Sequence, residues 1–158
     1  MVNLENEVGR LLREKKLTIS CAESCTGGLL TSRLTDVAGS SVYVRGSIVS
    51  YSNIVKHSVL NVKIETLQEF GAVSEQTARQ MSENVRELFK TDIGVGVTGI
   101  AGPGGGSDVK PVGTVYISVS NADKTEVKRF NFSGTRAEIK SQSANAAMNM
   151  VKQLAGSL

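Results

Sequence analysis

The segment ESCTGG (23–28) holds two side chains that could act as nucleophiles, the hydroxyl of Ser24 and the thiol of Cys25. An apolar run precedes the segment and a helical pattern follows it, which would set the Ser24 hydroxyl at a helix N-terminus. Free backbone N–H groups there could stabilise an oxyanion, and glycines let a ligand approach closely. The purely structural alternative is a capped turn, with Ser24 or Thr26 as the N-cap.

A serine or cysteine nucleophile needs a base, and the sequence offers few. The chain has a single histidine, His57, so a Ser-His-Asp triad or a Cys-His pair would have to use it. An equal candidate is Lys56, because Asn53 could cap a helix that carries Lys56 in its first turn. Burial and a helix N-terminus both lower the pKa of a lysine, as a neutral lysine base requires. The structural alternatives are a solvated lysine and a histidine on a helix surface.

Two further segments could bind a substrate. The glycine-rich run at 96–106 follows an apolar stretch and could cradle a phosphate, although it matches neither the P-loop nor the dinucleotide pattern. Arg136 opens the last predicted helix, and its guanidinium could bind a phosphate or carboxylate through two hydrogen bonds. The alternatives are a flexible loop and an ordinary first-turn arginine. Glu23 could orient the site or bond the backbone, and the sequence leaves both open.

The elements that must position these residues follow from the spacing of apolar residues. Helices are predicted over 4–15, 29–35, 53–59, 64–70, 75–89 and 135–154. Strands are predicted over 17–22, 41–51, 91–99, 112–120 and 125–133, the last two forming a hairpin. Helices interspersed with apolar strands predict an α/β fold, a three-layer α/β/α sandwich on a mixed, mostly parallel sheet.

Some details of these elements are also predicted. Gly46 would mark a β-bulge in the strand at 41–51. Ser74 opens the helix at 75–89, and Thr135 caps the last helix. The inward face of the helix at 75–89 is predicted at Ala78, Met81, Val85 and Leu88.

The composition restricts the function further. The 158 residues have a net charge of +3, and 40% are apolar, which predicts a single domain over 1–158 with a real core. Two cysteines four positions apart and one histidine argue against a CxxC redox pair and against a zinc site, so no metal is expected. The low charge and scarce aromatics argue against nucleic acid, and no apolar run suits a membrane span. We expect a cytoplasmic protein whose exposed sheet edges would allow a homodimer.

Four motifs occur together: AESCTGG (22–28), VSYSNIVK (49–56), GAVSE (71–75) and GVTGIAGPGGGSDVKPVGTVYI (96–117). Together they resemble the CinA C-terminal domain family, also called the nicotinamide mononucleotide deamidase family, over about residues 5–155. The resemblance implies hydrolysis of the nucleotide's carboxamide to the acid and ammonia, with no metal or other cofactor. It also implies the free-standing form of a domain that in many relatives follows a molybdopterin-binding-like domain.

The resemblance assigns roles to particular residues. Ser24 is the implied nucleophile, Lys56 its base, and Tyr51 an assisting residue that relays the proton or holds the lysine. The nucleotide phosphate is expected at the loop 102–106 or at Arg136. The predicted substrate-binding residues are Cys25, Thr26, Gly27, Thr98, Gly102, Gly104, Gly105 and Arg136. The alternative function is a nucleotide-binding module without catalysis, of the competence or damage-inducible kind, which would release no ammonia.

Overall fold

A computed structural model describes residues 3–158 of the chain. The strands within this range are β1 (Ile19–Glu23), β2 (Val44–Val49), β3 (Ile93–Gly99), β4 (Thr114–Ser120) and β5 (Thr125–Asn131). They form one five-stranded sheet in the order β2-β1-β3-β4-β5. β1 is parallel to β2 and β3, and β4 is antiparallel to β3 and β5, so β4 alone runs against the others. The predicted mixed, mostly parallel sheet is confirmed.

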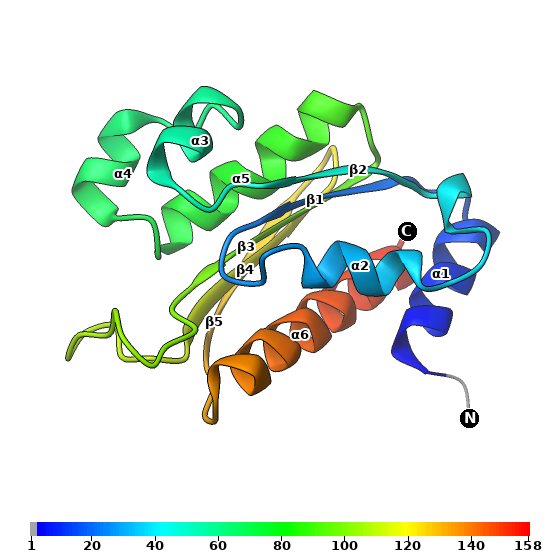
Figure 1. Cartoon of the computed structure of the whole chain (residues 1–158). Helices are drawn as coiled ribbons and strands as arrows, with labels where there is room; N and C mark the ends of the chain where they lie inside the picture. Colours follow the sequence, from blue (N-terminus) through cyan, green and yellow to red (C-terminus); the bar gives the residue numbers. More distant parts are fainter. Residues whose placement is uncertain (1–2) are drawn as a thin grey trace.

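Helices cover both faces of the sheet (Figure 1). One layer holds α1 (Leu4–Glu14), α2 (Leu29–Thr35) and α6 (Arg136–Gly156), and the other holds α3 (Asn53–Ser58), α4 (Ile64–Phe70) and α5 (Glu75–Phe89). The predicted α/β/α sandwich is therefore confirmed. None of the helices described within residues 3–158 is both long and apolar enough to cross a membrane.

The sheet brings two segments far apart in the sequence to one edge. β1 and β3 are parallel neighbours, with Glu23 opposite Val97, and the backbone N–H of Ser24 donates to the Val97 carbonyl at 3.0 Å. β2 lies on the other side of β1, with Val49 opposite Glu23. The segments that follow these three strands therefore emerge side by side, which is where an open α/β sheet binds its ligands.

The inward face of α5 differs from the prediction at one position. Ala78, Met81 and Val85 are buried as predicted, but Leu88 is 50% exposed, so that part of the prediction is wrong. Phe89 packs in its place, because it lies one full turn after Val85 and its ring rests against Gly46. A Cβ on Gly46 would stand 2.4 Å from that ring, which explains the glycine in β2.

Two observed boundaries differ from the predicted ones because of local hydrogen bonding. The predicted strand at 41–51 begins later, at Val44, because residues Ser40–Val42 form a 3₁₀ turn, η1. The predicted irregularity near Gly46 is confirmed, since the register with β1 skips Arg45. Ser52, rather than the predicted Asn53, caps α3 by accepting from the Val55 N–H. Ser74 and Thr135 cap α5 and α6 as predicted.

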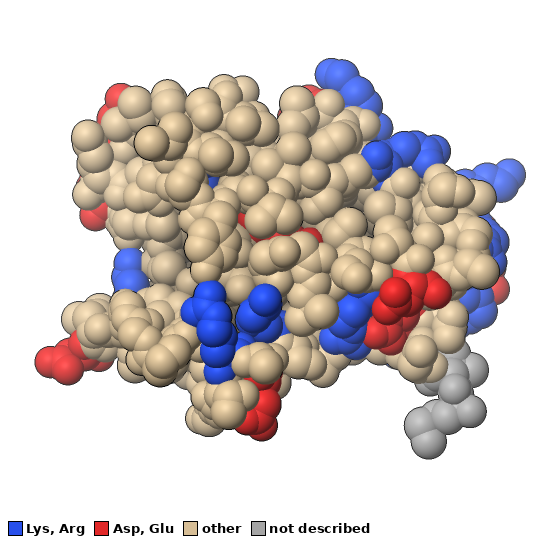
Figure 2. All heavy atoms as spheres, in the orientation of Figure 1, with Lys and Arg blue, Asp and Glu red and all other residues tan. Residues whose placement is uncertain are grey.

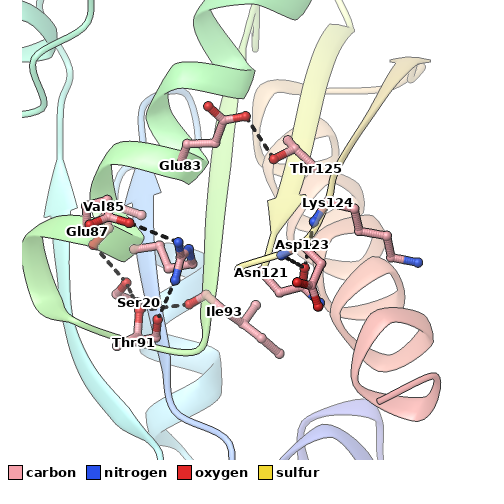
Figure 3. A network of polar contacts seen from close by, with 11 residues as sticks. Ser20, Glu83, Val85, Glu87, Thr91, Ile93, Asn121, Asp123, Lys124 and Thr125 are labelled. Atoms are coloured by element: carbon pink, nitrogen blue, oxygen red, sulfur yellow. Dashed lines mark hydrogen bonds and ion pairs between the residues drawn. The ribbon is translucent and has the colours of Figure 1, made fainter.

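Buried hydroxyls attach α5 to the strands at the opposite end of the sheet (Figure 3). Ser20 Oγ donates to the Val85 carbonyl at 3.1 Å and lies 2.7 Å from Thr91 Oγ1. The Thr91 hydroxyl donates to the Ile93 carbonyl at 3.0 Å. Because buried polar groups are costly to leave unpaired, these bonds fix where the end of α5 meets β1 and β3.

Close approach between α5 and β3 generates the first prediction. A Cβ on Gly94 would stand 2.1 Å from the backbone oxygen of Ser82. Gly94→Ala should therefore push α5 off the sheet and lower the free energy of unfolding by about 2 kcal/mol or more, as overpacking does. The control is Gly156→Ala, where a Cβ meets nothing within 4 Å and helix propensity favours alanine. Urea denaturation of both variants measures the effect, and equal stability of Gly94→Ala and wild type would contradict it.

Candidate active site

A cavity of about 280 Å³ opens at the edge of the sheet where β1 and β3 end. The long loop after β3 and the start of α6 border the same edge (Figure 1). All four sequence motifs contribute residues to its lining, and GAVSE contributes Ala72 and Val73. The lining residues are Ser24, Cys25, Tyr51, Asn53, Lys56, Ala72, Val73, Thr98, Gly99, Ile100, Ala101, Gly102, Gly104, Gly105 and Arg136.

Ser24 and Lys56 form a buried pair in this cavity. Lys56 Nζ lies 2.9 Å from Ser24 Oγ and donates to the Ser50 carbonyl at 2.6 Å. Lys56 is 1% exposed and Ser24 is 8% exposed. The lysine side chain is therefore held by two oxygens, and one of them belongs to the predicted nucleophile.

Burial lowers the pKa of Lys56 to about 8, because the ammonium loses its hydration. No carboxylate within the described residues forms an ion pair with it to offset that loss. The predicted position of Lys56 at a helix N-terminus is wrong. Since Ser52 is the cap, Lys56 is the fourth residue of the six-residue α3, away from the positive end that would lower its pKa.

Glu23 organises the turn after β1. Its buried carboxylate accepts from the N–H groups of Gly28, Leu30 and Thr31 at 3.2, 3.0 and 2.9 Å, and from the Thr31 hydroxyl at 2.6 Å. Glu23 therefore satisfies the free amides at the start of α2. Neither predicted cap, Ser24 nor Thr26, has this role, and the N-terminus of α2 is not open to a substrate.

Open backbone amides lie in the turn itself. The N–H of Ser24 is bonded to Val97, and the N–H of Gly27 donates to the Ser24 carbonyl at 3.0 Å. Over residues 3–158, no other residue accepts a hydrogen bond from the N–H of Cys25 or Thr26. Of these two residues only Cys25 lines the cavity, so its amide, directly after the serine, fits a donor to an oxyanion that is supplied by the turn rather than by the helix.

The Cys25 side chain lines the cavity but is poorly suited to act as a nucleophile. Burial raises the pKa of its thiol to about 12, because the thiolate would lie in an apolar environment. At neutral pH the thiol is protonated, and the protonated form is a weak nucleophile. Of the two candidate nucleophiles, Ser24 alone contacts the lysine.

Tyr51 and Arg136 meet across the cavity mouth. Arg136 donates to the Tyr51 hydroxyl at 2.8 Å and to the Gly102 carbonyl at 2.7 Å. Tyr51 is 61% exposed, and no hydrogen bond joins it to Lys56 within the described chain. The part of holding the lysine, expected for Tyr51, belongs to the Ser50 carbonyl, and Tyr51 instead orients the arginine.

The other predicted binding residues divide into two groups. Gly102, Gly104 and Gly105 line the cavity with Thr98, whose hydroxyl is used internally and donates to the Ala72 carbonyl at 2.8 Å. Thr26 and Gly27 do not line the cavity. Both lie farther along the turn, and Thr26 is fully buried.

Sequence reasoning missed Ser50 and Asn53 as site residues. Ser50 acts through its carbonyl, which carries no sequence signal. The sequence does contain a signal for Asn53. Ser52 and Asn53 are both residue types that cap helices, and only one of them can cap α3. Because Ser52 takes that position, the Asn53 amide is left to line the cavity.

The family comparison supports the four motifs. Residues 1–155 match the model of the CinA C-terminal domain. The chain belongs to the CinA C-terminal domain family. Within residues 3–158 of this CinA domain, no group of three or more His, Cys, Asp or Glu side chains is arranged to hold a metal ion.

Several relatives and solved structures are similar along nearly the whole chain. CinA-like proteins of Endomicrobium trichonymphae and Syntrophus aciditrophicus are each 49% identical to it over 95% of its length. The chain spans 35% and 36% of these relatives, about a third of their length. The crystal structure of competence/damage inducible protein CihA from Agrobacterium tumefaciens is 38% identical, with a TM-score of 0.92, and the match covers 98% of this chain and 96% of that one. A CinA superfamily protein from Klebsiella pneumoniae is 32% identical, with a TM-score of 0.94 and coverage of 98% and 97%.

The lowered pKa of Lys56 predicts a pH-dependent stability. Between pH about 8 and about 10.5 the unfolded state binds a proton at this lysine that the folded state does not, so stability rises with pH in this window. Relative to that of Lys56→Met, the free energy of unfolding of the wild type should rise by about 3 kcal/mol between pH 7.5 and pH 10.5. Chemical denaturation at both pH values measures the difference. The control is Lys124→Met at an exposed position, where the difference from wild type should not change with pH. If the difference for Lys56→Met is equally independent of pH, burial does not lower the pKa of Lys56.

Proposed function

We propose that this CinA domain is an amidohydrolase that converts the carboxamide of nicotinamide mononucleotide to the acid and releases ammonia. The observation that carries the proposal is the 2.9 Å contact between Lys56 Nζ and Ser24 Oγ, in a buried pair whose lysine has its pKa lowered to about 8. A nucleophile within hydrogen-bond reach of a base near neutral pKa is the arrangement that acyl transfer requires.

The first step is attack on the amide. With a pKa of about 8, roughly a tenth of Lys56 is neutral at pH 7. In the neutral form its lone pair faces the Ser24 hydroxyl, while an N–H still donates to the Ser50 carbonyl. Ser24 Oγ attacks the carboxamide carbon as Lys56 takes the hydroxyl proton. The charge that develops on the carboxamide oxygen is stabilised by the turn amide of Cys25, and one such donor is worth roughly 3 kcal/mol in sites of this kind.

The second step releases ammonia. The protonated Lys56 returns its proton to the amide nitrogen, the carbon–nitrogen bond breaks, and an ester on Ser24 remains. Water then attacks this ester, and Lys56 takes a proton from that water and gives one to the departing Ser24 oxygen. The products are the acid and ammonia, and the enzyme regains its starting form.

The choice of a pyridine nucleotide rests on the family resemblance and on the cavity. The cavity, with about 280 Å³, is at the small end of the range for small-molecule sites, which suits an aromatic amide better than a large substrate. Arg136 at its mouth supplies a positive charge for an anionic substrate. Purified protein should therefore release ammonia from nicotinamide mononucleotide faster than from free nicotinamide. Binding of the nucleotide without ammonia release would favour a non-catalytic nucleotide-binding module instead.

The identity of the nucleophile is tested by a pair of neighbouring substitutions. Ser24→Ala should reduce kcat by at least about 10³-fold, because no other hydroxyl contacts Lys56. Cys25→Ala should keep activity within about tenfold, since the thiol is protonated at neutral pH and serves to pack the core and the cavity wall. Ammonia release under saturating nucleotide measures both variants, with circular dichroism to confirm folding. The opposite order of effects would make Cys25 the nucleophile.

If Lys56 is the base, the rate of ammonia release should depend on pH. The rate at saturating nucleotide should rise with pH through an apparent pKa of about 8, as Lys56 loses its proton. Lys56→Arg should be nearly inactive although it keeps the charge, because a guanidinium does not give up its proton in this range. Substantial turnover by Lys56→Arg, or a rate independent of pH between 6.5 and 9, would exclude the lysine as the base.

A further inference from the structure

A second hollow of about 590 Å³ lies next to the catalytic cavity and shares Arg136 with it. Its walls come from the start of α2 and the first two turns of α6. Figure 2 shows Lys and Arg side chains gathered over the N-terminal part of α6. We name this hollow the α6 groove; its lining residues are Leu29, Arg136, Ala137, Lys140 and Ser141.

The α6 groove carries two cations on one face. Arg136 and Lys140 are four residues apart on α6 and therefore project side by side. Lys140 is half-buried, and its Nζ lies 3.6 Å from where a Cβ on Gly27 would stand. The bond from the Gly27 N–H to the Ser24 carbonyl closes a tight turn, which keeps the Cα atoms of these two residues within about 7 Å. The Lys140 ammonium thus lies beside the turn that carries Ser24.

These two cations lack acidic partners. Over the described residues, neither Lys140 nor Arg136 forms an ion pair. Arg136 donates only to neutral oxygens. Two nearby carboxylates are engaged elsewhere: Glu23 is saturated by the start of α2, and Glu138 accepts from the Thr135 N–H in the α6 capping box. The groove therefore holds positive charge that nothing in the described chain neutralises.

We propose that the α6 groove binds the phosphate monoester of the mononucleotide, with Lys140 and Arg136 as its cationic ligands, while the carboxamide lies against Ser24. This inference rests on the proposed function and assigns the phosphate to α6 rather than to the glycine-rich loop. A guanidinium offers paired hydrogen bonds to phosphate oxygens, and an ammonium adds a point charge. Leu29 and Ala137 supply apolar walls of the same groove, against which the ribose would lie.

The test compares Lys140→Gln with Lys124→Gln, which loses the same charge at an exposed turn residue on β4–β5. Calorimetry measures the affinity for nicotinamide mononucleotide and for its riboside, which lacks the phosphate, and ammonia release measures turnover. Lys140→Gln should weaken nucleotide binding about tenfold and lower the preference for nucleotide over riboside by the same factor. Lys124→Gln should leave both unchanged.

The two readouts separate this inference from the proposed function. If the wild type releases no ammonia but Lys140→Gln still loses nucleotide affinity about tenfold, the phosphate site stands and the hydrolase proposal falls. If Lys140→Gln binds and discriminates as the wild type does, the phosphate site is wrong, whatever the turnover. A wild type that shows no preference for the nucleotide over the riboside overturns it as well.

Discussion

The burial of Lys56 without a counter-charge is the constraint on which the site depends. An ammonium removed from water is costly, and here only the Ser50 carbonyl and the Ser24 hydroxyl compensate it. Both oxygens must therefore be held in place by the sheet. Ser50 is fixed because its N–H and its hydroxyl both donate to the Glu23 carbonyl, at 2.7 and 3.2 Å. The pairing of β1 with β2 thus positions the carbonyl that holds the lysine.

Glu23 links the same strand to the shape of the nucleophile turn. Its backbone carbonyl holds Ser50, and its carboxylate caps α2. The residue therefore orders both sides of the turn while taking no part in the chemistry. Because it satisfies the amides of α2, the amides directly after the serine that keep no acceptor in another residue of the described chain are those of Cys25 and Thr26, and of these only Cys25 lines the cavity. A carboxylate directly before a proposed nucleophile can thus have a structural role.

The mouth of the cavity is assembled from segments distant in the sequence. Arg136 joins the start of α6 to Tyr51 and to Gly102, and Thr98 joins the end of β3 to Ala72. These bonds connect the glycine-rich loop, the segment after β2 and the segment before α5. A change in any one of them would therefore displace the walls that a substrate contacts, even where no catalytic atom moves.

The sequence by itself determined the elements and the candidate chemistry, because these depend on short-range patterns. Apolar spacing predicted α4 and α5 at their observed bounds, and the Thr135–Glu138 capping box opened α6 where predicted. The sequence motifs also named Ser24 and Lys56, which the structure brings into contact. Only the tertiary structure decided that burial rather than a helix end lowers the pKa of Lys56, that a carbonyl rather than Tyr51 holds this lysine, and that Glu23 caps α2. The bonds of Lys56 to Ser50 and of Glu23 to α2 join residues only five to eight positions apart. Whether they form, and how fully a side chain is dehydrated, depends on how the strands and helices pack, and local spacing does not record that packing.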